Sequence, residues 1–331
     1  MVRWAIVGFG DIARKAVAPA IQAHVGSELV AICRRDPAGL AADADAFEVS
    51  GRHTDYATML AAGGFDAVYV ASPVYLHAPH ALAAIQRGLH VLVEKPMALN
   101  GDEAQSMVEA AVRANATLGV AFYHRFYPIN FRVKELVESE AIGTLIALHG
   151  NASSSMDAAT LAQPKMRWRV NRSQSGGGPL ADIGSHRLDI FHSLAGPAAR
   201  VAAFVDRRAV EGDVEDTAAV IVQYRSGVQA TLSSLWTANP ARGDYEVWGS
   251  NGYINVPYAR GSEIVLQSPS GNRETLTIPP GELHDLPLID DFVRAMQTGG
   301  APHISGPDGV EVQRVIDAAY QSAQTGRTVS L

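Results

Sequence analysis

A short glycine turn near the N-terminus constrains the fold of this chain more than any other feature. The apolar run VRWAIV leads directly into Gly8-Phe9-Gly10-Asp11-Ile12-Ala13, and a helical segment follows. In this strand-turn-helix context, the pattern G-x-G-x-x-G/A predicts a dinucleotide-binding turn. The first glycine makes the tight turn, and the second lets the backbone approach a pyrophosphate, which the N–H groups at the start of the helix bind. The alternative is a glycine turn without a ligand.

The rest of the first third alternates strands with helices. The runs SELVAIC, FDAVYVAS, LHVLVE and TLGVAF are rich in apolar and β-branched residues, and alanine-rich helical stretches separate them. This βαβ rhythm predicts a parallel sheet, and the nearly continuous apolar runs predict strands that are covered by helices on both faces. We therefore expect a doubly wound α/β domain, a Rossmann domain, over residues 1–123.

The pattern changes after about residue 123. Several strands then follow one another, and the hairpin signals Ser226-Gly227, Asn251-Gly252 and Ser270-Gly271 separate them. We expect a C-terminal α/β domain over residues 124–331, built on an open, mostly antiparallel sheet.

Composition argues against several classes of protein. A formal charge of −7 without a polybasic cluster disfavours nucleic-acid partners. No run approaches the roughly 18 apolar residues of a membrane span, and the first strand leaves no room for a signal peptide. The single cysteine, Cys33, fits a reducing compartment. We expect a soluble cytoplasmic protein without a metal site, since His77 and His80 have no third ligand nearby.

The end of the second strand bears on the choice of nucleotide. NAD-specific folds usually place an acid about 20 residues beyond the glycine turn, whereas this chain has Arg34 and Arg35. Guanidinium groups suit a 2′-phosphate, so NADP is the preferred cofactor and NAD the second choice. Alternatively, the arginines only end the strand, and Asp36 caps the next helix.

Several longer segments resemble the glucose-fructose oxidoreductase/inositol dehydrogenase (Gfo/Idh/MocA) family. They are VGFGDIA, ASPVYLHAPHALAAIQRGLHVLVEKPMAL with its Glu94-Lys95-Pro96 triplet, GGGPLADIGSHRLDIF and the C-terminal GPDGVEVQRVIDAAYQSAQTGRTVSL. The resemblance implies a Rossmann domain and an α/β domain that closes the substrate cleft and forms dimers or tetramers through its open sheet. The similarity is greatest to the NADP-using anhydrofructose reductase and sugar dehydrogenase branches.

The resemblance also implies which further residues contact the cofactor. They are Ser72, Pro73, His77, Glu94, Lys95, Pro96, Arg125, Trp168 and Arg169. His77 would shape the nicotinamide pocket or cap the helix that follows, and Arg125, at the end of the sixth strand, could bind substrate or phosphate. Ordinary packing or ion-pair roles stay open for these residues. Val74 replaces the asparagine that members commonly carry, which puts one ribose or nicotinamide contact in doubt.

Hydride transfer at a hydroxyl carbon needs a proton carrier and a positive group near the oxygen. By resemblance, Lys95 lies after the fifth strand and polarises the reacting oxygen. Asp182 and His186 are four residues apart on a predicted helix, so they share one face. His186, which titrates near neutrality, is the expected general acid/base, and Asp182 would orient its ring or bind substrate hydroxyls. The alternative for His186 is a core histidine that is bonded to backbone.

These features predict an NAD(P)-dependent oxidoreductase that acts on a hydroxyl or carbonyl carbon of a sugar or polyol. Two alternatives remain open: a nucleotide-binding sugar sensor without chemistry, and an NAD-assisted glycosidase of the same fold. The intact set of Lys95, Asp182 and His186 favours the dehydrogenase or reductase.

Overall fold

The computed structural model describes residues 1–281 and 285–331, and the chain divides into two compact units. The first unit contains Met1–Tyr123 and, further along the chain, residues 285–310, and the second contains His124–Gly281 and Glu311–Leu331. The sequence prediction divided the chain once, after residue 123. Residues 285–310, which it placed in the second domain, group with the first unit instead.

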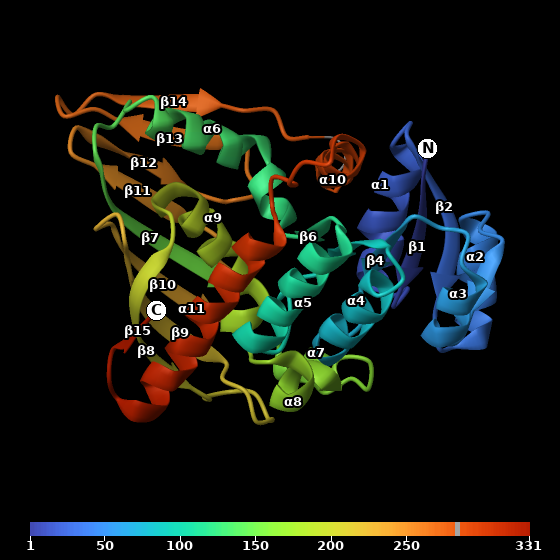
Figure 1. Ribbon diagram of the computed structural model, residues 1–331. Coiled ribbons are helices and arrows are strands. Elements are labelled where there is room, and N and C mark those ends of the chain that lie inside the picture. The colour runs from blue at the N-terminus through green and yellow to red at the C-terminus, as the bar shows by residue number, and fades with distance from the viewer. Residues whose placement is uncertain (282–284) are drawn as a thin grey trace. The chain divides into compact units, whose positions relative to one another are not determined.

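The first unit is built on a six-stranded sheet with the strand order β3-β2-β1-β4-β5-β6, in which all paired strands run parallel. The strands are β1 Val2–Val7, β2 Ser27–Cys33, β3 Gly51–His53, β4 Ala67–Val70, β5 His90–Val93 and β6 Leu118–Val120. The helices are α1 Ala18–Ala23, α2 Pro37–Ala46, α3 Tyr56–Ala62, α4 His77–Ile85, α5 Gly101–Ala114 and α10 Leu286–Thr298. Figure 1 shows α4 and α5 side by side. The predicted doubly wound parallel sheet is confirmed.

The core of the first unit explains why α10 groups with it. β4 is buried along its whole length, as its apolar sequence predicts. Trp4 of β1 is fully buried and packs on Phe292 of α10, with their ring centroids 5.5 Å apart. Gly119 of β6 leaves room for the same ring, because a Cβ there would come within 3.0 Å of it.

The second unit is built on a nine-stranded sheet with the order β14-β13-β12-β11-β7-β10-β9-β8-β15. Of its pairs, β7 with β10 is parallel and the others are antiparallel. The strands are β7 Leu145–Ser153, β8 Ala198–Asp206, β9 Thr217–Tyr224, β10 Gln229–Leu235, β11 Tyr245–Gly249, β12 Gly252–Val256, β13 Glu263–Gln267, β14 Arg273–Thr277 and β15 Val329–Ser330. The prediction of a mostly antiparallel sheet is confirmed.

The three predicted hairpin turns join β9 to β10, β11 to β12 and β13 to β14. Each turn contains a glycine with a positive φ, namely Gly227, Gly252 and Gly271, as such turns require. The helices of this unit are α6 Pro128–Glu138, α7 Ala158–Leu161, α8 Arg172–Ser175, α9 Ser185–Ala195 and the second part of α11 Gly306–Thr325. Across the described ranges, none of the helices combines the length and the apolar character that crossing a membrane requires.

One face of the second sheet is covered and the other is open. α9 packs against β7, and α6 packs on α9 (Figure 1). β9 alternates buried with exposed residues along its length, as a sheet with one covered face does. The strand registers place Phe204, Ile221, Trp248 and Tyr253 together on the open face.

Candidate functional site

The two glycines of the N-terminal turn have different surroundings. Gly8 has a φ of +84°, and a Cβ there would lie 2.5 Å from the backbone nitrogen of Ser72, so no other residue fits. At Gly10 a Cβ would meet nothing nearer than the Gly8 carbonyl oxygen at 3.8 Å. Arg14 donates its N–H to the Gly10 carbonyl, so the helix starts beside this open stretch of backbone. These residues fit a dinucleotide that approaches the turn with its pyrophosphate.

The residues after β2 include both the arginine and the helix cap that the sequence analysis gave as alternatives. The Arg34 guanidinium donates to Asp43 at 2.5 Å and to Asp36 at 3.3 Å. Asp36 also caps α2, because its carboxylate accepts the Gly39 N–H at 3.0 Å. Arg35 is exposed. Asp36 therefore caps α2 and also contacts the Arg34 guanidinium, so the two alternatives do not exclude each other.

The His77 ring lies between two backbone carbonyl oxygens. Its Nδ1 lies 2.9 Å from the Pro96 carbonyl oxygen, and its Nε2 lies 2.7 Å from the Ser72 carbonyl oxygen. Burial lowers the pKa of His77 to about 4, against the opposing effect of these carbonyls. The ring therefore joins the segment after β4 to the segment after β5, and it would shape a nicotinamide pocket through Ser72 and Pro96 rather than by direct contact.

The Glu94-Lys95-Pro96 triplet directly follows β5. Tyr69 donates its hydroxyl to the buried Glu94 carboxylate at 2.8 Å, and the Lys95 backbone N–H lies 3.2 Å from the second carboxylate oxygen. The Lys95–Pro96 peptide bond is cis, and the Lys95 side chain is partly exposed while its two neighbours are buried. Lys95 therefore lies partly exposed just after the strand, between two buried residues.

Asp285 belongs to the same buried region, although no sequence signal indicated it. Its side chain is buried, and neither carboxylate oxygen has a hydrogen-bond partner among the described residues. Burial, followed by the charge of Glu94, raises the pKa of Asp285 from 3.8 to about 7.

In the second unit, His186 stacks on a second histidine. The structure places His186 in the first turn of α9, where it is buried. Its ring lies on that of His124, with centroids 3.9 Å apart and an angle of 12° between the planes, and His124 in turn stacks on Tyr127. Nothing in a linear pattern pairs His124 with His186, which lies 62 positions further along the chain.

Asp182 is held by one of the predicted cofactor residues. It lies in a π-helical turn, Leu180–Gly184, that precedes α9, and its carboxylate lies 3.0 Å from the Arg169 guanidinium. Arg169 in turn lies over the ring of Trp168, 4.8 Å from its centroid. The structure thus brings Asp182 together with the Trp168-Arg169 pair, which the sequence had singled out separately from it.

Arg125 takes the ion-pair role that the sequence left open. Its guanidinium donates to both carboxylate oxygens of Asp189, and both side chains are buried. The expectation that Arg125 lies at the end of the sixth strand is wrong: β6 stops at Val120, and Tyr123–Phe126 form a 3-10 turn.

The glycine triplet before α9 surrounds a buried carboxylate. Glu215 accepts the N–H groups of Gly178 and Leu180 at 3.0 and 3.2 Å, and the Tyr320 hydroxyl at 2.8 Å. A Cβ on Gly178 would lie 1.9 Å from the Glu215 carbonyl oxygen, and a Cβ on Gly177 would lie 1.9 Å from the Tyr320 hydroxyl. The bend that leads to Asp182 therefore requires glycine.

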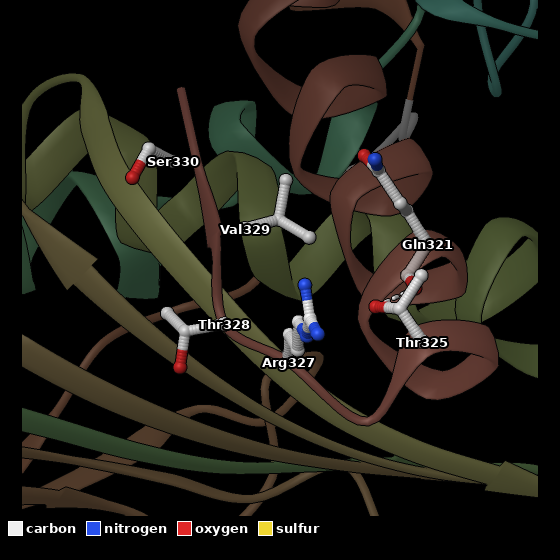
Figure 2. A pocket seen from close by; sticks show the side chains of 6 residues that line it. All are labelled: Gln321, Thr325, Arg327, Thr328, Val329 and Ser330. Carbon is white, nitrogen blue, oxygen red and sulfur yellow. Dashed lines mark hydrogen bonds between the residues drawn. The ribbon is translucent and has the colours of Figure 1, made fainter.

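A hollow in the second unit is lined by residues near the C-terminal end of the chain. Gln321 and Thr325 of α11 line it together with the chain that leads into β15 (Figure 2). Its remaining lining residues are Arg327, Thr328, Val329 and Ser330. None of the predicted site residues contributes to it.

Comparison with known proteins identifies the family. Residues 2–122 match the model of the Gfo/Idh/MocA oxidoreductase family with its NAD-binding Rossmann fold, and residues 131–255 match the model of the Gfo/Idh/MocA C-terminal domain. The chain is 32% identical to D-xylose 1-dehydrogenase (NADP(+)) 2 of Haloferax volcanii over 98% of both chains. It is 29% identical to 1,5-anhydro-D-fructose reductase of Ensifer adhaerens over 100% of this chain and 99% of the reductase.

Solved structures agree with this assignment. The aldose-aldose oxidoreductase of Caulobacter crescentus, crystallised with glycerol, superimposes with a TM-score of 0.90 at 27% identity, over 100% of this chain and 99% of that one. The glycine turn, the two sheets and the matches over both halves lead to one conclusion: this chain belongs to the Gfo/Idh/MocA oxidoreductase family.

Proposed function

We propose that this protein transfers a hydride between NAD(P), with NADP preferred, and a hydroxyl or carbonyl carbon of a sugar or polyol. The observation that carries the proposal is the glycine turn. A side chain at Gly8 would clash with the backbone of Ser72, whereas the space beside Gly10 is open, so a dinucleotide can approach the backbone there. The relatives favour a sugar, since the similar proteins are named as a xylose dehydrogenase and an anhydrofructose reductase.

The proposed chemistry assigns one task to each polar side chain. A bound nicotinamide supplies the hydride acceptor or donor. During oxidation, His186 takes the hydroxyl proton while the C–H hydrogen leaves as hydride, and the product is a carbonyl compound. Lys95 stabilises the negative charge that develops on the oxygen. Asp182, fixed by Arg169, binds substrate hydroxyls.

The test is a screen of aldoses, lactones and polyols with both nucleotides, which follows the absorbance of the reduced nicotinamide. We expect turnover with at least one sugar or polyol. His186→Ala should lower turnover by about 100-fold, the scale of a lost general acid/base, while the Kd for NADP stays within a factor of two. An equal loss of NADP affinity would show that His186 is structural.

The same screen separates the two alternatives. A sensor would bind nucleotide and sugar without turnover. An NAD-assisted glycosidase would release a sugar from a glycoside without any net change in reduced nicotinamide.

We also propose that the chain forms a dimer or tetramer through the open face of its second sheet, in a cytoplasmic location. Phe204 is 83% exposed and Ile221 is 55% exposed on that face, and Trp248 stacks on Tyr253 on the same face. Light scattering on the purified protein tests this assembly, and a monomeric mass at micromolar concentration would exclude it.

A further inference from the structure

Asp43 links the glycine turn to the end of β2. It is buried on α2, and its two carboxylate oxygens accept from two different arginines. Arg14, on the helix after the glycine turn, donates its Nε to one oxygen at 2.9 Å. Arg34, directly after β2, donates to the other at 2.5 Å. A single carboxylate therefore holds two guanidinium groups from separate elements.

The packing around Arg34 leaves its guanidinium little freedom. A Cβ on Gly39 would lie 2.3 Å from the guanidinium carbon, so the side chain fits closely over the first turn of α2. Asp36 contacts the same group at 3.3 Å. The Arg34 side chain is 27% exposed, so it is still accessible to a ligand.

Order of this kind affects binding because an arginine loses rotamer freedom when it contacts a phosphate. Fixing a rotamer-rich side chain costs free energy on binding. When a buried carboxylate already orients a guanidinium, its rotamer freedom is lost during folding rather than on binding. The planar guanidinium also matches the geometry of a phosphate. An adenosine ribose without a 2′-phosphate gains nothing from it.

We propose that Asp43 is a positioning residue for cofactor choice: it fixes the Arg34 guanidinium for the 2′-phosphate of NADP. The inference rests on the proposed function, because it requires that the glycine turn binds a nicotinamide dinucleotide. It assigns the preference for NADP to an acid that never contacts the phosphate.

The test compares Asp43→Asn with a matched control, Asp45→Asn. Asp45 lies on the same helix, is exposed and pairs with Arg52 at 2.6 Å. Asparagine keeps the shape of Asp43, but the two arginines donate to different carboxylate oxygens, and in asparagine one of these atoms is an NH₂ donor that cannot accept. We expect the Kd for NADP to rise about tenfold and the Kd for NAD to stay within a factor of two. The Asp45 variant should match the wild type.

A double-mutant cycle shows whether Asp43 acts through Arg34. In an Arg34→Gln background, Asp43→Asn should not change the ratio of the two dissociation constants any further. This comparison remains informative if Asp43→Asn also lowers the Tm, because it rests on the ratio.

Each outcome has one meaning. If Asp43→Asn binds NADP as tightly as the wild type or more tightly, Asp43 only neutralises Arg34 and the inference is wrong. A further change of the ratio in the Arg34→Gln background overturns it as well. A wild type that binds neither nucleotide would instead contradict the proposed function.

Discussion

Asp285 has a pKa that is raised into the neutral range. It is buried before α10, and burial together with Glu94 raises its pKa from 3.8 to about 7. The folded state therefore binds this proton more tightly than the unfolded state does. The resulting stabilisation is complete below about pH 4 and is lost as the pH rises through about 7.

Asp285→Asn should therefore stabilise the protein at pH 8 and have little effect at pH 4. The amide has the shape of the carboxyl group and carries no charge, so we expect a Tm higher by a few degrees at the upper pH only. Thermal unfolding over this pH range measures it. The control is Asp290→Asn on the same helix, where the side chain is 68% exposed. An equal shift at both pH values would contradict the proposed buried charge.

At the scale of residues, the sequence identified candidate site residues but not the side chains that contact them. Asp182 and Arg169 were selected separately, and their ion pair emerged only in the structure. Arg125 and Asp189 lie 64 positions apart, so no local pattern shows that they form an ion pair. The same holds for the stacked rings of His124 and His186. Local patterns carry residue type and periodicity, whereas these contacts depend on how separate elements pack.

At the scale of elements, the glycine bend before α9 is the feature most sensitive to a single methyl group. Its backbone N–H groups point at the buried Glu215, and the Glu215 carbonyl occupies the space that a side chain on Gly178 would need. Burial raises the pKa of Glu215, and the surrounding donors partly oppose this effect.

Gly178→Ala should lower the Tm by more than Tyr320→Phe does. The alanine forces the backbone apart, whereas the phenylalanine removes one hydrogen bond to Glu215, worth about 1–3 kcal/mol when the acceptor stays buried. Turnover should fall in both variants, because the bend precedes Asp182. Thermal unfolding with a parallel activity assay measures both effects. A Gly178→Ala protein as stable as the wild type would refute this packing.

Strands with an apolar run were predictable, and elements without such a signal were not. Apolar runs located β1, β2, β4, β5 and β6, and Ser/Asn-Gly pairs located three hairpins. β3 is three residues long and partly exposed, so its sequence carries no apolar run. The π-helical turn at Leu180–Gly184 follows from tertiary packing that no periodicity encodes.

At the scale of the whole molecule, the class of each half followed from the sequence, but the path of the chain did not. Residues 285–310 return to the first unit, where Phe292 packs on Trp4 and Ser305 pairs with Gly119. Helix periodicity predicts that α10 has an apolar face, but it does not say which sheet that face covers.

The account depends on a nicotinamide nucleotide that binds at the open backbone of Gly10. The most direct measurement is a calorimetric titration of the wild type and Gly10→Val with NADP and NAD. A Cβ at this position meets no close neighbour, so we expect the fold and the Tm to be preserved while the valine side chain fills the space for the pyrophosphate. We predict that the wild type binds NADP more tightly than NAD and that the variant binds neither. A wild type without affinity for either nucleotide, or a variant that binds as well as the wild type, would contradict the account.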